Sequence, residues 1–271
     1  MAIAGPASRV DSAPAALEAY EPLASAYDDF TAAYRHDRWL AALERLALEH
    51  GLSGRRVLDV ACGTGKSFMP LLARGYQVTA CDLSPSMVAV ARERLGGDPA
   101  RAFVADMRAL PSVAAFDLVT CLDDAVNYLL TEDDLVRALA SMRATLRPGG
   151  LLAFDVNTLR TYRTTFARDA VDDRRGRFFC WRGHASADAA PGQVHAATLD
   201  VFTPAPEEGW RRVTSRHLQR HHPLTDVRRS TGRAGLTLLA VRGQLPGAIL
   251  EGEADEERHT KLVFLATRKE M

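Results

Sequence analysis

The 271-residue sequence predicts an α/β protein organised around a parallel β-sheet. The apolar run at 56–60 is rich in β-branched residues and bounded by polar ones, as is typical of a buried parallel strand. A glycine turn follows it, and a helical segment begins at Ser67. Strand-like and helical segments then alternate as far as residue 156, as successive strand–helix units require.

The glycine turn after the first strand predicts a nucleotide-type site. Gly63 and Gly65 allow a tight turn and a close approach of the backbone to a ligand. Free N–H groups at the start of the next helix favour an anionic or polar group. A Walker phosphate loop is excluded, because Val60 stands where its first glycine belongs. Phe68 replaces the third glycine of a dinucleotide fingerprint, which weakens that interpretation without eliminating it.

Acidic residues follow the next two predicted strands. Asp82 ends the run at 75–82, at the offset from the glycines at which a carboxylate binds ribose hydroxyls, and Ser84 is the predicted N-cap of a helix over 85–95. Asp106 follows the run at 100–105. Further strands are expected at 116–122 and at 151–156, the last after a helix that closes at 146–150.

These segments together resemble the successive motifs of class I S-adenosylmethionine (SAM)-dependent methyltransferases of the small-molecule type. The matching segments, in order and spacing over residues 55–157, are 57–65 (VLDVACGTG), 81–87 (CDLSPSM), 105–107 (ADM) and 146–150 (LRPGG). One motif alone would be weak, whereas the ordered set is specific.

The resemblance implies a Rossmann-like doubly wound sheet of about seven strands with a C-terminal antiparallel hairpin and a small inserted antiparallel sheet. It divides the chain into an N-terminal leader and helical lid (1–54), a SAM-binding core (55–159), an inserted acceptor-binding antiparallel sheet (160–222) and a return to the core (223–271).

The resemblance also implies SAM as cofactor, S-adenosylhomocysteine as its product, and a set of contacts. Ala61, Gly63 and Gly65 would lie at the methionine part, Asp82 at the ribose, Leu83 and Met87 at the adenine faces, Asp106 and Met107 at the adenine amino group, and Leu122 at the SAM amino group, with Tyr27 and Trp39 in the lid. The alternative for Asp82 and Asp106 is that they only form turns at strand ends.

The N-terminal region carries the lid. Residues 1–15 are rich in Ala, Pro, Gly and Ser and are expected to be a mobile leader. Asp37 is expected to cap an amphipathic helix over 39–49 whose apolar face includes Leu48. Tyr27 and Trp39 are expected to cover SAM, and Tyr20 is a candidate acceptor contact; the alternative for all three is that they join this helix to the sheet.

Polar residues after the fourth predicted strand are candidates for the acceptor pocket, since they interrupt an apolar stretch at the carboxyl end of a central strand. They are Asp123, Asp124, Asn127 and Tyr128, with Asp123 and Tyr128 as candidates for catalysis. Asp124 has the alternative role of capping the following turn.

The inserted sheet is predicted from strand-like runs at 177–184, 194–202 and 210–222. Alternation on the last run would point His217 and His221 to one face, as candidate catalytic bases. Trp181 and His222 are candidate acceptor contacts, although a surface or hydrogen-bonded role is the alternative for each histidine. Adjacent His221 and His222 would point to opposite faces, so no metal site is expected.

The chain is then expected to return to the core. A helix over 225–234 would stop at Gly235, and strands at 236–242 and 261–268 would form the closing hairpin. The acidic stretch at 251–257 is expected to be a solvated loop.

The composition of the chain limits the classes of partner and the cellular location that can be expected. The formal net charge is +0, with 34 basic and 34 acidic residues, which argues against nucleic acid as a partner. The 4 cysteines form no CxxC pair and are expected to be reduced thiols. Without a signal sequence or a long apolar run, the chain is expected in the cytoplasm, away from membranes, with a homodimer left open.

The leading hypothesis is a methyltransferase that moves a methyl group from SAM to a nitrogen or oxygen of a small metabolite, similar to enzymes of antibiotic and amino-sugar pathways. Nitrogen is favoured because no catalytic base stands out. The alternatives are a SAM-fold protein without methyl transfer, such as a cyclase or a binding module, and an NAD-dependent dehydrogenase. Phe68 and the 146–150 motif argue against the dehydrogenase.

Overall fold

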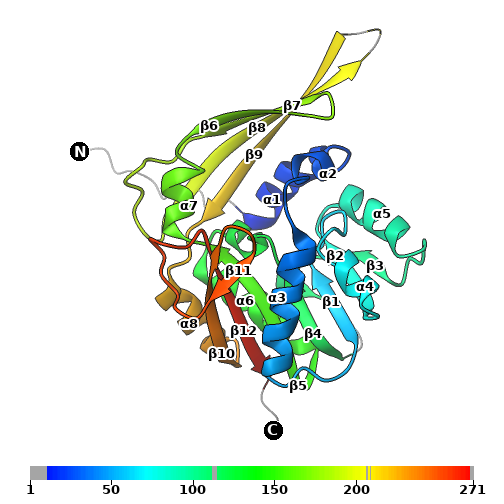
Figure 1. The fold of residues 1–271 in the computed structure, drawn as a ribbon, viewed down its shortest axis with the longest axis vertical. Helices are drawn as coiled ribbons and strands as arrows, with labels where there is room; N and C mark the ends of the chain where they lie inside the picture. Colours follow the sequence, from blue (N-terminus) through cyan, green and yellow to red (C-terminus); the bar gives the residue numbers. More distant parts are fainter. Residues whose placement is uncertain (1–10, 112–114, 206, 208, 269–271) are drawn as a thin grey trace.

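The computed structural model describes residues 11–111, 115–205, 207 and 209–268 (Figure 1). Sheet A has eight strands in the order β11-β10-β12-β5-β4-β1-β2-β3. The five strands from β5 to β3 are parallel, and β12, β10 and β11 continue the sheet in antiparallel pairings. The predicted fold class is therefore confirmed, including the closing hairpin of β10 and β12.

The strands of sheet A are β1 (Arg56–Val60), β2 (Gln77–Asp82), β3 (Ala102–Val104), β4 (Phe116–Cys121), β5 (Leu146–Asn157), β10 (Leu236–Leu245), β11 (Ile249–Glu251) and β12 (Lys261–Arg268). The α-helices are α1 (Ser12–Tyr20), α2 (Tyr27–Phe30), α3 (His36–Glu49), α4 (Met69–Ala73), α5 (Pro85–Arg94), α6 (Glu132–Thr145), α7 (Leu159–Thr164) and α8 (Leu224–Arg233). The short 3₁₀ helices are η1 (Glu21–Leu23), η2 (Met107–Ala109) and η3 (Ala125–Tyr128).

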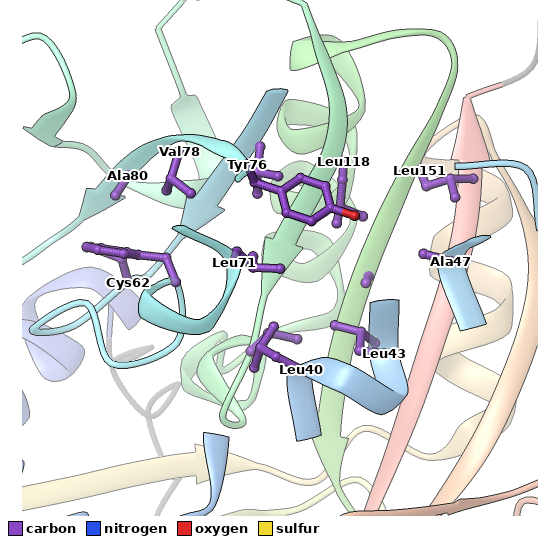
Figure 2. Close-up of a cluster of buried hydrophobic side chains, with 14 of the residues drawn as sticks. Leu40, Leu43, Ala47, Cys62, Leu71, Tyr76, Val78, Ala80, Leu118 and Leu151 are labelled. Atoms are coloured by element: carbon purple, nitrogen blue, oxygen red, sulfur yellow. The ribbon is translucent and has the colours of Figure 1, made fainter. Parts of the chain in front are cut away.

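Helices cover both faces of sheet A. Apolar residues of α3, α4 and α5 form one core cluster with the sheet, and Figure 2 shows Leu40 and Leu43 of α3 among the strand side chains of this cluster. Residues of α6 and α8 form a second cluster on the opposite face. Successive residues of β1 serve the two cores, since Val57 belongs to the first and Leu58 to the second.

Sheet B is the inserted antiparallel sheet. It contains β6 (Asp169–Arg174), β7 (Arg177–Gly183), β8 (Val194–Ala205) and β9 (Gly209–Arg220) in sequential order. Phe179, Leu199 and Val201 pack against Leu23 and Ala26 of the N-terminal segment. The segment around α1 and η1 thus lies between sheet B and the core (Figure 1).

Several details of the N-terminal region differ from the sequence expectations. Helix α1 already begins at Ser12, whose buried hydroxyl donates to Asp134, so only residues 1–10 of the expected leader lie outside the described part. Helix α3 begins before the expected cap, and Asp37 pairs with Arg35 inside the first turn. Leu48 is 55% exposed, because it lies off the stripe that packs on the sheet.

Later segments also differ in detail. Strand β5 begins at Leu146, so the Pro-Gly-Gly turn expected before it lies within its bounds. Strands β6 and β11 were missed because they are short or highly charged. The stretch at 251–257 is not simply solvated, since Glu251 contacts buried His259 and Glu256 contacts buried His221.

Gly65 offers a test of the turn that precedes α4. A Cβ on Gly65 would lie 2.3 Å from the ring of buried Phe68, whereas one on Gly75 would meet nothing within 4 Å. Both residues have positive φ, so alanine strains the backbone at both positions. We expect Gly65→Ala to lower the free energy of unfolding by about 1 to 3 kcal/mol more than Gly75→Ala, as overpacking does. Urea denaturation measures both, and equal losses would mean that Phe68 yields freely.

Candidate active site

A pocket lies at the carboxyl edge of the parallel strands. It encloses about 970 Å³, counting its solvent-filled mouth. Its wall combines the turn after β1, the ends of β2 and β3, the segment after β4, and residues of α1 and α2. Ligands bind at this edge in open α/β sheets, so the position is the expected one.

Asp82 holds the glycine turn in shape. Its carboxylate accepts hydrogen bonds from the N–H of Gly63 at 2.8 Å and from that of Ser84 at 2.9 Å. Burial raises its pKa, while these backbone N–H groups oppose the rise. Gly63 and the non-glycine Ala61 both have positive φ, at 54° and 56°. The backbone of this turn is therefore held in an unusual conformation next to the carboxylate of Asp82.

Asp59 supports the turn from within the core. It accepts hydrogen bonds from the hydroxyls of Ser67 at 2.5 Å and Thr120 at 2.6 Å. Burial raises its pKa to about 6, although the two hydroxyls oppose the shift.

The raised pKa of Asp59 predicts a pH effect on stability. Between its ordinary pKa and about 6 the folded state holds a proton that the unfolded state has lost, so this group's contribution to stability falls as pH rises through that range. Because asparagine does not titrate, the stability of Asp59→Asn relative to the parent should rise by up to about 3 kcal/mol between pH 4 and pH 7. Guanidinium denaturation at both pH values measures this. Exposed Glu93→Gln is the control, and a pH-independent difference would contradict the assignment.

The side of the pocket near β3 is apolar with one carboxylate. Leu83, Met87 and Met107 line it together with Asp106. Burial disfavours the charge on Asp106, but hydrogen bonds from Arg108 outweigh this effect and lower its pKa. Arg108 also lines the pocket and reaches Asp134 of α6. Arg108 could not be singled out from its sequence position, because surface arginines are common at such turns.

The N-terminal segment roofs the pocket through polar contacts. Glu21 accepts hydrogen bonds from the hydroxyls of Ser84 and Ser86 at the start of α5. Asp28 binds Thr64 in the glycine turn and Arg94 at the end of α5. Lys66 donates to the carbonyl of Thr31 at 2.8 Å, and the Tyr27 ring lies against Gly63.

Aromatic hydroxyls line the end of the pocket under sheet B. Tyr20 donates to Tyr128 across 2.9 Å, and the Tyr128 hydroxyl lies 2.8 Å from Nδ1 of His217. Burial lowers the pKa of His217 to about 4, so its neutral ring accepts from Tyr128. The expected candidates Tyr128 and His217 are thus hydrogen-bonded, with Tyr128 in the pocket wall and His217 behind it.

Strained backbone follows β4. Asp123 and Asp124 adopt left-handed conformations with φ of 58° and 55°. Asp123 faces the pocket and lies 2.7 Å from Nε2 of His36. Asp124 instead lies 2.6 Å from Nζ of Lys261, which is 2.9 Å from Asp155. Two adjacent carboxylates therefore have different surroundings.

Other expected site residues lie in the interior around the pocket. Trp39 belongs to the core cluster of α3 with Lys261 near its ring, and Gly65 faces Phe68. Asn127 is fully buried, donating to the carbonyl of Arg220 and accepting from the N–H of Asn157. Packing therefore accounts for the positions of Trp39 and Gly65, and hydrogen bonds to the backbone account for that of Asn127.

Three further candidates, which were expected on the inserted sheet, are not among the residues that line the pocket. His221 lies beyond the end of β9, so strand alternation does not reach it, and it is fully buried beside Glu256. His222 bonds the carbonyl of Leu129, and Nε1 of Trp181 donates to the carbonyl of Thr165. The side chains of His221, His222 and Trp181 thus each have a polar contact within the protein.

Metal and membrane features can be assessed for the described part of the chain. There, no group of three or more His, Cys, Asp or Glu side chains is arranged to hold a metal ion. Within the same residues, none of the helices has the length and apolar character needed to cross a membrane.

The residues present fit SAM. The half-buried carboxylate of Asp82 suits a ribose diol, and the apolar side with Leu83, Met87 and Met107 suits a purine. The turn at Gly63, with its free backbone surface, admits a polar methionine tail. A Cβ at position 63 would make only an ordinary contact with Tyr27, at 3.4 Å, so glycine is favoured there by its positive φ and not by a lack of space.

Comparisons with known proteins agree with this geometry. Residues 57–150 match a family described as a methyltransferase domain. YqeM of Bacillus subtilis, whose name assigns it provisionally to the methyltransferases, is 28% identical over 88% of this chain and 94% of its own length. The cypemycin N-terminal methyltransferase of a Streptomyces species is 30% identical over 72% of this chain and 78% of that protein.

A solved structure adds the cofactor. SAM-bound CalS10, an amino pentose methyltransferase of Micromonospora echinaspora involved in calicheamicin biosynthesis, is 27% identical and superimposes with a TM-score of 0.67, covering 90% of this chain and 95% of that one. From its motifs, its pocket and these relatives, the chain belongs to the SAM-dependent methyltransferases.

Proposed function

We propose that the protein transfers the methyl group of SAM to the amino nitrogen of a small metabolite. The observation that carries the proposal is the polar end of the pocket, where Asp123 and His36 lie in the same wall as Tyr20 and Tyr128. A carboxylate there attracts an ammonium group, and aromatic rings bind cations and sugar faces. The amino pentose acceptor named for CalS10 supports the same class.

Each part of the pocket has a role in this reaction. When bound, SAM supplies a methyl group on a positively charged sulfur, already activated for direct transfer. Asp82 and the backbone at Gly63 would hold the cofactor, and the roof around Tyr27 would exclude water. Tyr20, Tyr128 and Asp123 would place the acceptor nitrogen in line with the methyl group, which supplies much of the rate enhancement.

Sheet B is proposed to shape the acceptor end. His217 of β9 fixes the hydroxyl of Tyr128 from behind the pocket wall, and the ring of Tyr20 packs edge-on against His217. Residues 160–222 would then influence the choice of acceptor through these two tyrosines without touching the cofactor.

The test is a transfer assay with deuterated-methyl SAM and a small-metabolite extract, read by mass spectrometry. We expect at least one amine to gain the labelled methyl group. Matched extract in which amines have been acetylated beforehand should yield no product. Labelling that survives acetylation would assign a hydroxyl acceptor, and binding of S-adenosylhomocysteine without any transfer would indicate a binding module.

A further inference from the structure

His36 and Asp123 form a hydrogen-bonded pair among the residues that line the pocket. They lie 87 residues apart in sequence, at the start of α3 and just after β4, and Nε2 of His36 is 2.7 Å from the Asp123 carboxylate. His36 is 9% exposed. Its second ring nitrogen, Nδ1, is buried and has no hydrogen-bond partner among the described residues. The hydrogen bond at Nε2 therefore orients the His36 ring, and Nδ1 has no partner among the described residues.

The carboxylate decides which nitrogen carries the proton. Burial disfavours the charged form of Asp123, but the hydrogen bond from His36 and the charge of Lys261 lower its pKa, so the carboxylate is ionised. An ionised carboxylate only accepts hydrogen bonds, so Nε2 of His36 donates to it. In the neutral ring Nδ1 then carries the lone pair, which is the arrangement in which a carboxylate orients a catalytic histidine.

His217 lacks this property, although it is also buried near the pocket. Its Nδ1 accepts from Tyr128 and its Nε2 lies 3.1 Å from the hydroxyl of Ser215, so both ring nitrogens are occupied. Burial lowers its pKa to about 4, which makes it a weak base. His217 therefore has no free ring nitrogen, whereas His36 has an Nδ1 without a hydrogen-bond partner among the described residues.

The backbone supports a functional role for the pair. Asp123 is held at φ of 58° in a conformation that residues other than glycine rarely adopt. Such strain persists where the surrounding structure imposes it, often at active sites. The groups that face the pair are Lys261, with Nζ at 3.8 Å from Asp123, and Tyr34, whose ring packs edge-on against His36. Lys66 contributes a more distant positive charge.

We propose that His36 is the catalytic base, oriented by Asp123, that takes a proton from the ammonium form of the acceptor. This inference rests on the proposed amine methylation. The N–H bond of the ammonium breaks and its proton goes to the free ring nitrogen of His36. The lone pair that is released forms the new N–C bond, while the C–S bond breaks and its electron pair stays on sulfur. Asp123 stabilises the imidazolium that results.

The proposal predicts a specific pH signature for His36→Gln. With the amine identified in the transfer assay, kcat/KM near pH 7 should fall about 100-fold, at the lower end of general-base contributions. The variant should then gain about tenfold per pH unit up to the pKa of the amine, because hydroxide in the buffer replaces the base and supplies neutral acceptor. The parent should level off at lower pH, so the two profiles converge in alkali.

Asp123→Asn provides a second test of the pair, and substitution of a distant histidine provides the control. Asp123→Asn should lower kcat/KM in the same direction, whereas His50→Gln, at the opposite end of α3, where Nδ1 bonds the carbonyl of Leu46, should match the parent. Calorimetry should give S-adenosylhomocysteine affinities for His36→Gln within about threefold of the parent, the scatter of substitutions outside a binding site. Parallel pH profiles, or an affinity loss equal to the loss in kcat/KM, would overturn the base assignment. A failure of the parent to methylate any amine would instead refute the proposed function.

Discussion

Replacing Asp82 with alanine is expected to weaken S-adenosylhomocysteine binding by about 30- to 150-fold. In the proposed mode of cofactor binding the carboxylate accepts the ribose hydroxyls, and two hydrogen bonds to a partly desolvated carboxylate are worth on the order of 2 to 3 kcal/mol. The same side chain accepts the N–H groups of Gly63 and Ser84, so its removal also loosens the turn that carries the methionine contacts. Isothermal titration calorimetry measures the loss directly.

Asp117 provides a matched control for this substitution. It is also an aspartate of a parallel strand and is itself buried, but its carboxylate accepts from the N–H of Arg56 at 2.9 Å and from Arg147 at 2.6 Å, at the opposite edge of the sheet. We expect Asp117→Ala to lower the free energy of unfolding and to leave S-adenosylhomocysteine affinity nearly unchanged. Equal losses of affinity in the two variants would refute the assignment of Asp82 to the ribose.

The core of the fold could be predicted because its signals are local. The apolar run at 56–60, the glycines at 63 and 65, and the acids at 82 and 106 each occupy a fixed offset along one strand–turn–helix unit. From these offsets alone, the residues can be assigned to one edge of a parallel sheet, and no long-range contact has to be known.

The acceptor end could not be predicted in the same way, because its contacts join distant segments. His36 precedes the expected start of its helix, and its pairing with Asp123 depends on how α3 crosses the sheet. Lys261 lies on the last strand, far along the chain from Asp124 and Asp155, and no local sequence pattern predicts its contacts with them. Conversely, His221 looked catalytic on a strand pattern that ends one residue before it.

Removing the charged group of Lys261, which lies beside the pocket residue Asp123, is expected to be costly for stability. Its ammonium group, on a side chain 13% exposed, lies 2.6 Å from Asp124, 2.9 Å from Asp155 and 3.8 Å from Asp123. Lys261→Met keeps most of the apolar stem but leaves these carboxylates without their cation. Breaking a buried ion pair in this way costs about 3 to 5 kcal/mol. Guanidinium denaturation at pH 8 should show this loss, whereas Arg233→Met, which breaks an exposed pair with Glu132, should cost less than about 1 kcal/mol.

The pH dependence distinguishes charge from packing as the origin of that loss. Burial raises the pKa of Asp155 to about 6 even with Lys261 opposing the rise, and removing the cation raises it further. Below that pKa the folded state can protonate Asp155, so the stability difference between Lys261→Met and the parent should shrink as pH falls from 8 to 5. The double variant Lys261→Met with Asp155→Asn should recover part of the loss at pH 8, because one unpaired carboxylate is gone. A loss that is constant with pH and unchanged in the double variant would mean that Lys261 stabilises the fold through packing on Trp39 instead.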